Sequence, residues 1–470
     1  MLRMRRTVDW EGIEKSLASY YDAWTGRPSF APALLVRMLV LEYYADLSDR
    51  EVEEQAGYNL LYRDFLGLGM DDRVPDSTTL VRFRDRIGEE GIRKVFAEVN
   101  RQLEAAGLVG SDRRLLDGVH LWAKVARASW VGLMRSGREK VYDALGRVKP
   151  EKAEMLRKGL ELAEPAPEPR GEDALRVERE RTERLLDAVR SVQDERVRDR
   201  ADLLAALLAD RDRPVSFDDP DARWGYKKED MPFCGYKAHE AIDPESRIIT
   251  SVDVVPGNAN EAVRTADLLA GDTVGREESA VIIADALYNN STTVQQVEEA
   301  KGRPCFAGLS AERKSDDFEY SEQTDEMICP AGKHSIGKVR VGAGDLYYFS
   351  VGDCNRCPFR ETCLTPGERE GSAQPRRRIY LSDVRKKKRV AGEAGREWRR
   401  SELRLRGRIE AKFDEQVNRH GMRHARYWGL AKVTIQVVLT AITVNLKRAA
   451  KLILQRSAQG PEEVARAMSG

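Results

Sequence analysis

Three carboxylates stand out because of the segments that carry them. Asp285 directly follows the apolar run VIIA, Asp117 follows an LL pair, and Glu410 lies in a predicted helix over residues 402–418. Short apolar runs predict buried strands, and the carboxyl ends of strands often carry ligand chemistry in open α/β sheets. Each residue also has a local interpretation: a helix cap for Asp285, a hairpin turn for Asp117, and a solvent-facing helix residue for Glu410.

Taken together, these carboxylates indicate metal-dependent chemistry on phosphate esters. Carboxylates are hard oxygen ligands, and like charges at close range oppose each other's ionisation unless cations lie between them. Two Mg²⁺ (or Mn²⁺) ions would resolve that repulsion and support an in-line phosphoryl displacement. The sequence has no glycine-rich phosphate loop, no Gly-x-Ser-x-Gly elbow and no His-Glu-x-x-His motif, so other common hydrolytic sites are not indicated.

A basic segment, residues 376–408, leads into the Glu410 helix. It holds 14 Lys/Arg and 4 Asp/Glu, a local net charge of +10 in a chain of 470 residues whose net charge is +1. Such a segment predicts contact with a polyanion, and its lack of Asn and Gln favours backbone phosphates over base edges. The candidates are Arg385, Lys386, Lys387, Lys388 and Arg389.

The cysteines predict a structural metal site in a reducing compartment. Cys354 and Cys357 form a Cys-x2-Cys pair, with Cys363 and Cys329 nearby, which is typical of a four-thiolate Zn²⁺ site. The alternatives are scattered reduced thiols, or His334 in place of one thiolate. Cys234 and Cys305 fall in predicted strands and are expected to be buried apolar thiols.

Residues 1–110 predict short helices joined by glycine-containing turns. Ser48–Glu51 has the form of a capping box, and a later helix displays Arg82, Arg84 and Arg86. This pattern suits a helix-turn-helix DNA-binding module and an ordinary helical bundle about equally.

Further along the chain, residues 139–212 are charged and predict helices. Residues 233–255 predict a β-hairpin. Lys237 and His239 share one face of its first strand and are candidates for phosphate contact. No secretory signal follows the basic start of the chain. The most apolar stretch, 430–446, contains Lys432, Gln436 and Asn445 and predicts a core helix, not a membrane span. These features favour a cytoplasmic protein.

The motifs together resemble the DDE transposases of bacterial insertion sequences, in particular the group with a cysteine-rich insert before the final glutamate. The resemblance covers most of the chain and rests on these segments: PSFAPALLVRMLVLEYY, PDSTTLVRFRDRI, LLDGVHL, DPDARWGYKKE, GYKAHEAID, VVPGNANE, VIIADALY and RIEAKFDEQVNRHGMRHARYWG. It implies an RNase H-like α/β core with a mixed sheet, a helical N-terminal domain, a helical insertion and a small Cys-rich insert.

Matched residue by residue, the resemblance makes Asp117, Asp285 and Glu410 the catalytic, metal-binding triad. Arg406, four residues before the glutamate, fills the place of an arginine in related transposases. The chain departs from the family at Leu403 and Val417, where a tyrosine and a lysine are common, and at Leu287, where glycine is usual.

The domain organisation implied by the resemblance has seven parts. They are 1–110, a DNA-binding or dimerisation domain; 111–138 and 213–324, the two parts of the core; 139–212, the helical insertion; 325–375, the Cys-rich insert; 376–456, the basic segment and C-terminal helices; and 457–470, a polar tail. The expected partner is double-stranded DNA, both element ends and target, bound by a homodimer at the nucleoid. A metal-dependent nuclease on the same core and a non-catalytic DNA-binding derivative are the alternatives.

Overall fold

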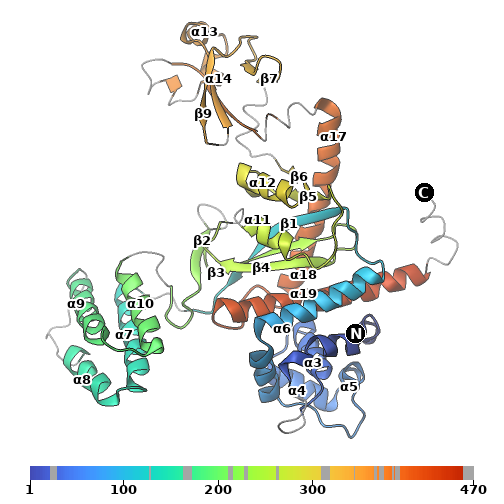
Figure 1. The fold of residues 1–470 in the computed structure, drawn as a ribbon, viewed down its shortest axis with the longest axis vertical. Coiled ribbons are helices and arrows are strands. Elements are labelled where there is room, and N and C mark those ends of the chain that lie inside the picture. Colours follow the sequence, from blue (N-terminus) through green and yellow to red (C-terminus); the bar gives the residue numbers. More distant parts are fainter. Residues whose placement is uncertain are drawn as a thin grey trace.

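A central β-sheet separates the N-terminal helices from a small β-rich unit, and a helical module lies to one side (Figure 1). The computed structural model describes residues 1–21, 29–125, 129–161, 172–209, 215–226, 231–260, 264–307, 318–342, 344–364, 368–369, 375–383, 386 and 392–458.

The N-terminal region is helical, as predicted. Its α-helices are α1 (Leu2–Arg5), α2 (Trp10–Ser16), α3 (Pro32–Tyr44), α4 (Asp49–Tyr58), α5 (Leu60–Leu66) and α6 (Ser77–Ala105), with a 3-10 turn, η1 (Ala18–Tyr20). Pro32 occupies the first turn of α3, and Ser48 and Glu51 form the predicted capping box of α4. Gly88, at φ +58°, interrupts α6 and divides it into two helical segments, in keeping with the predicted glycine-containing turns.

The central sheet is mixed. Its strands are β1 (Arg113–Trp122), β2 (Arg223–Tyr226), β3 (Pro232–Ile242), β4 (Ile249–Pro256), β5 (Val281–Ala284) and β6 (Arg303–Phe306). The order β2-β3-β1-β5-β6 places β1 at the centre, and β4 also pairs with β3. β1 runs antiparallel to β3 and parallel to β5, and β5 runs parallel to β6. The two parallel neighbours bring the carboxyl ends of β1 and β5 to the same edge.

Asp117 and Gly118 lie inside the continuous strand β1, so the hairpin interpretation of this dipeptide is wrong. Eight residues of β1, from Leu115 to Trp122, pair with β3. The ring of His239 on β3 packs over Gly118, where an added Cβ would meet its Nδ1 at 3.1 Å. The glycine therefore serves close packing across the sheet and not a turn.

Helices cover both faces of the sheet. One face packs Leu116, Ala241 and Ile282 beneath α11 (Thr265–Ala270) and α12 (Ser291–Glu299). The other packs Leu115 and Tyr236 against α6, α18 (Gly407–Arg419) and α19 (Leu430–Ala458). α19 lies alongside α6 beneath the sheet (Figure 1). None of the helices in the described ranges has the length and apolar character that a membrane crossing requires.

Two further units have cores of their own. The helical module comprises α7 (Trp130–Gly146), α8 (Pro150–Glu161), α9 (Glu172–Val189) and α10 (Glu195–Leu208). The predicted charged helical region breaks after Val189, and Asp194 caps α10, so that α9 and α10 both pack on α7.

The small β-rich unit contains β7 (Glu319–Ser321), β8 (Glu326–Ile328), β9 (Gly337–Val341), β10 (Gly344–Tyr348), α13 (Val351–Asn355), α14 (Arg360–Cys363) and β11 (Arg378–Ser382). Phe318, Met327, Tyr347 and Phe349 are buried in its core. It connects to the sheet through α17 (Gly392–Leu403), which is followed by the 3-10 turn η5 (Arg404–Arg406) and then α18. One helix over 402–418 was predicted; the structure has a break at η5.

Candidate functional site

Asp117 lies within β1, and Asp285 directly follows β5, the parallel strand that pairs with the start of β1. Leu115 of β1 pairs with Ile283 of β5, and each aspartate follows two residues later. The Oδ1 of Asp117 accepts a hydrogen bond from the Gly118 N–H at 2.8 Å, and the Oδ1 of Asp285 accepts one from the Leu287 N–H, also at 2.8 Å. The sheet register therefore places two carboxylates that are 168 positions apart in the sequence on neighbouring parallel segments of the chain.

Asp285 is both a helix cap and a strand-end residue. Three of the four β5 residues are buried, and Asp285 is the N-cap of the 3-10 turn η3 (Ala286–Tyr288). The local interpretation of this residue as a cap is thus confirmed, and it leaves the parallel alignment with Asp117 unchanged. Leu287, in the position where related transposases carry glycine, is 59% exposed.

Glu410 lies in the first turn of α18, a helix that packs on the sheet. Ile409 and Phe413 are buried against the sheet. Arg408 donates to the Pro244 carbonyl at 2.8 Å and pairs with Glu245 at 2.7 Å. The Glu410 side chain is 64% exposed and lies 3.8 Å from Arg406, so it can reorient without breaking a buried contact.

The three predicted catalytic carboxylates do not form a ready metal site. In the described part of the chain, no group of three or more His, Cys, Asp or Glu side chains is arranged to hold a metal ion. The sheet aligns Asp117 with Asp285, and α18, which carries Glu410, contacts β1. The expected convergence of all three side chains is therefore not present in this structure.

A fourth carboxylate, Glu240, adjoins Asp117. It is its direct cross-strand partner on β3, and it is fully buried. Gln416 of α18 donates to its Oε1 at 2.8 Å, and burial raises the pKa of Glu240 to about 7. Glu240 was not among the predicted site residues. The period of two along β3, which places Lys237 and His239 on one face, also places Glu240 on the opposite face, which is that of Asp117.

His239 is not available to phosphate, contrary to prediction. It is 1% exposed, and its Nδ1 lies 3.1 Å from the hydroxyl of Tyr288, three residues after Asp285. Burial lowers the pKa of His239 to about 4, so the ring is neutral at pH 7. Lys237 is also buried, and its Nζ donates to the Ala259 carbonyl at 3.0 Å. Both side chains hold the sheet together.

His239 makes folding stability depend on pH. The pKa of His239 in the folded protein lies below the ordinary value of 6.5. Its contribution to the free energy of unfolding is therefore complete above pH 6.5 and is lost as the pH falls towards 4. Relative to His239→Gln, the wild-type free energy of unfolding should fall by roughly 3 kcal/mol between pH 7 and pH 4. Urea unfolding across this range measures the difference. His424→Gln, at an exposed histidine, is the control, and parallel curves for wild type and His239→Gln would refute the assignment.

The three N-terminal arginines have different surroundings. Arg82 and Arg86 are exposed, and the Arg86 guanidinium lies 4.8 Å from the centre of the Tyr21 ring. Arg84 is buried and pairs with Asp49 at 2.6 Å and with Glu42 at 3.2 Å. Arg84 therefore serves the packing of the N-terminal helices, and its predicted contact with DNA is wrong in this structure.

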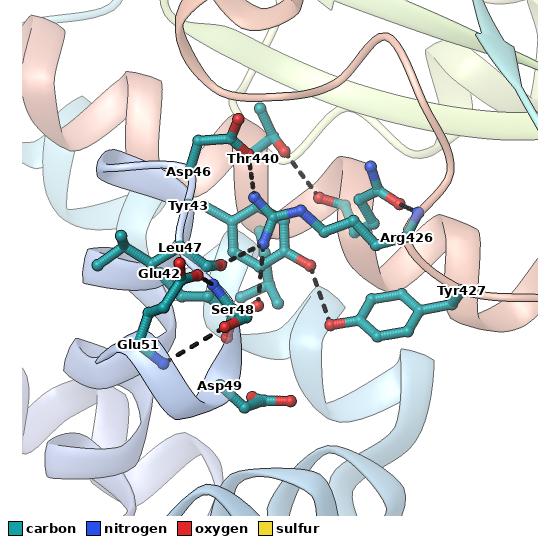
Figure 2. Close-up of polar contacts among 12 residues, drawn as sticks. Glu42, Tyr43, Asp46, Leu47, Ser48, Asp49, Glu51, Arg426, Tyr427 and Thr440 are labelled. Carbon is teal, nitrogen blue, oxygen red and sulfur yellow. Dashed lines mark hydrogen bonds and ion pairs between the residues drawn. The ribbon is translucent and has the colours of Figure 1, made fainter. Parts of the chain in front are cut away.

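Glu42 also joins the N-terminal helices to the segment after α18. Arg426 donates to Glu42 at 3.2 Å and to the Leu47 carbonyl at 2.8 Å, and it pairs with Asp46 (Figure 2). The Tyr427 hydroxyl lies 3.5 Å from that of Tyr43 in the same view. Burial raises the pKa of Glu42 to about 7, while the two arginines act in the opposite direction.

Most of the predicted DNA-binding cluster in the basic segment, namely Arg385, Lys387, Lys388 and Arg389, lies outside the described residues. Lys386 pairs with Asp345 at 2.6 Å and with Asp325 at 3.1 Å, within the small β-rich unit. Arg406 is partly exposed beside Glu410. At the positions where the resemblance implies a tyrosine and a lysine, Leu403 packs against the main core and Val417 is buried.

Four cysteines line one cavity of about 540 Å³ in the small β-rich unit: Cys329, Cys354, Cys357 and Cys363. The Lys333 N–H donates to the Cys329 sulfur at 3.3 Å, and the Arg377 N–H donates to the Cys354 sulfur at 3.5 Å. Burial raises the pKa of the Cys354 and Cys363 thiols. The two N–H donors suit thiolates, which are the form that binds metal.

The remaining cysteines and the alternative histidine lie elsewhere. His334 contacts Glu326 through Nδ1 at 2.9 Å and is not among the residues that line the cysteine cavity. Cys305 is buried as predicted, whereas Cys234 is only partly buried.

Comparison with known families matches the two ends of the chain. Residues 1–86 match the Transposase domain (DUF772) family, and residues 328–450 match the Transposase DDE domain family. The second match contains Glu410 and the four clustered cysteines, whereas Asp117 and Asp285 lie between the two matches. No solved structure matches the chain. Together, the two matches support an insertion-sequence DDE transposase.

Proposed function

We propose that this transposase binds the ends of its mobile element, cleaves phosphodiester bonds there and joins the ends to target DNA. The observation that carries the proposal is the parallel pairing of Leu115 with Ile283, because Asp117 and Asp285 each follow two residues after that pair. The sheet also supports an RNase H-like core: the central strand β1 has antiparallel β3 on one side and parallel β5 and β6 on the other. Glu410 follows on a later helix that packs on the same sheet.

Asp117, Asp285 and Glu410 are the residues that would hold divalent cations. The two aspartates fit this role because the strand register aligns them and each accepts a backbone N–H through one oxygen. Glu410, exposed and paired only loosely with Arg406, would join them by side-chain rotation. When bound, Mg²⁺ would activate a water or a 3′-hydroxyl and stabilise charge on the phosphate. Gln416 and Ile409 fix α18 on the sheet, and Arg406 would contact the phosphate backbone.

DNA would be read and held by different parts of the chain. Arg82 and Arg86, exposed on α6, remain candidates for end recognition, and the basic segment from 376 to 408 would contact phosphates near the carboxylates. Two copies of the chain, each bound to one end of the mobile element, would form the active dimer.

A Mg²⁺-dependent cleavage assay on duplexes that carry the inverted repeats flanking the gene tests this function. The expected result is specific cleavage at the repeat ends that EDTA abolishes. Binding of the repeats without cleavage at any concentration of Mg²⁺ or Mn²⁺ would instead favour the second candidate function, a non-catalytic DNA-binding protein. One observation favours that alternative: Glu410 is outside any three-carboxylate group in the described residues.

We further propose that Cys329, Cys354, Cys357 and Cys363 hold one structural Zn²⁺. All four line one cavity, but their sulfurs do not form a ready metal site in the described part of the chain, so binding would have to draw them together and displace the thiol protons that burial retains. The core of the small β-rich unit is small, so the metal would stabilise this unit.

Elemental analysis of purified protein should therefore give about one zinc per chain. Cys354→Ser and Cys357→Ser should lose most of it, because a structural site needs four ligands. Cys234→Ser, outside the cavity, is the matched control and should retain the metal. Wild-type protein that is free of zinc when purified without chelators would exclude the site.

A further inference from the structure

A strongly basic cavity lies between α18, α19 and the turn that joins β3 to β4. Its volume is about 300 Å³. Six cationic residues line it: Arg247, Lys412, Arg419, Lys447, Arg448 and Lys451. Among the described residues that line it, the carboxylates are Asp414 and Glu415, so positive charge exceeds negative charge by four. Neither the family matches nor the carboxylate site accounts for this concentration of charge.

Part of the charge is already neutralised within the cavity. The Glu415 carboxylate lies between Lys412 Nζ at 3.1 Å and Lys447 Nζ at 2.8 Å. Burial opposes its ionisation, but the two lysines prevail and lower the pKa of Glu415 to about 2. Glu415 is therefore ionised at neutral pH and fixes both lysines in place.

Three cations at the cavity are left unengaged. Arg247, Arg419 and Lys451 are exposed and form no ion pair or side-chain hydrogen bond with any residue in the described ranges. Arg247 lies in the β3–β4 turn at φ +60°, a conformation that favours glycine or asparagine. The turn is held by Arg448, whose Nε donates to the Ser246 carbonyl at 2.5 Å. The turn between β3 and β4 thus places an arginine at the cavity, although its backbone conformation favours glycine or asparagine at this position.

The cations form a row and not a single point. A second cavity of about 380 Å³ adjoins the first, shares Lys447 and Lys451 with it, and adds Arg3. Lys447 and Lys451 are one helical turn apart on α19 and lie on the same side. A row of cations suits the repeated charges of a nucleic-acid backbone better than one small anion.

We infer that the row formed by Arg247, Arg419, Lys447, Arg448 and Lys451, the α18–α19 cation track, binds backbone phosphates of a DNA duplex. Arg419 and Glu410 are nine residues apart on α18, which is two and a half turns, so they project from opposite sides of the helix. The track would therefore hold a stretch of DNA away from the scissile bond. This inference rests on the proposed function for the identity of the polyanion.

The test measures DNA affinity against salt concentration with the full chain, in the absence of divalent metal. The variant Arg247→Gln/Arg419→Gln/Lys451→Gln removes the three unengaged cations. Its control, Arg190→Gln/Arg198→Gln/Lys149→Gln, removes two exposed arginines and one exposed lysine from the helical module. The log–log salt slope of the track variant should flatten by about 0.9 for each phosphate that the protein no longer neutralises, uniformly across DNA sequences. The control should keep the wild-type slope.

Two kinds of result would overturn the inference. The first is an unchanged slope in the track variant, or equal changes in the track variant and the control. The second comes from calorimetric titration with inorganic phosphate, which shows whether the track binds a small anion instead of DNA. The inference would be overturned if the track variant lost phosphate binding but kept the wild-type salt slope for DNA. Because binding is measured without metal, the two proposals can fail separately. Absence of cleavage would contradict the proposed function, whereas a flattened salt slope in the track variant would still support DNA binding by the track.

Discussion

Asp285→Asn should abolish Mg²⁺-dependent cleavage of the element ends while leaving DNA binding intact. The substitution keeps the side-chain shape and the oxygen that accepts the Leu287 N–H, but removes the negative charge that a metal ligand needs. Loss of groups that merely support a metal ligand reduces activity by about 10- to 100-fold, so loss of a direct ligand should reduce it by more than about 100-fold. Asp117→Asn and Glu410→Gln should behave alike.

The measurement is single-turnover cleavage at saturating DNA, alongside an affinity measurement without metal. Glu299→Gln, which alters an exposed carboxylate on α12, is the control and should cleave at the wild-type rate. If Glu410→Gln retained full activity while both aspartate variants were inactive, Glu410 would not be the third ligand. Retained activity in Asp285→Asn would remove the carboxylate site altogether.

Arg426→Met should destabilise the protein by about 3–5 kcal/mol, the usual loss when one partner of a buried ion pair is removed. Glu42 is 1% exposed and would lose one of its two arginines, and the Leu47 carbonyl would lose its donor. Because these contacts join α3 to the segment that follows α18, unfolding of the N-terminal helices and of the central sheet should both shift to lower urea concentration.

Urea unfolding followed by tryptophan fluorescence measures this effect. Arg423→Met is the matched control, because Arg423 is exposed and three residues away, and it should change the stability by no more than about 0.5 kcal/mol. Equal midpoints for the two variants would show that the Glu42 contacts contribute nothing measurable.

The sequence predicted the elements that carry strong local signals. The apolar run at 281–284 is the buried strand β5, the 233–255 hairpin is β3 and β4, and the apolar stretch from Leu430 is a core helix. β5 and the helix from Leu430 are continuous apolar runs, and their burial in the fold agrees with that character.

The predictions that were wrong concern residues whose surroundings are set by contacts with distant parts of the chain. Asp117–Gly118 has the local form of a turn, yet pairing with β3 and β5, more than 100 residues later, holds it in a strand. Arg84 and His239 have the types expected of DNA contacts, but acidic residues from α3 and α4 surround the first, and the packing of helices on the sheet buries the second. Residue type and spacing cannot show which side chains tertiary packing encloses.

A strand-transfer assay tests directly whether the protein joins element ends to target DNA. Duplexes that end in the element's inverted repeat, already cleaved to expose the 3′-hydroxyl, would be incubated with the protein, supercoiled plasmid and Mg²⁺. The expected products are plasmid molecules joined to the repeat ends, with no product when EDTA is added or when the protein carries Asp117→Asn. Cleavage of DNA without any joined product would contradict the proposed strand transfer and identify a nuclease on the same core.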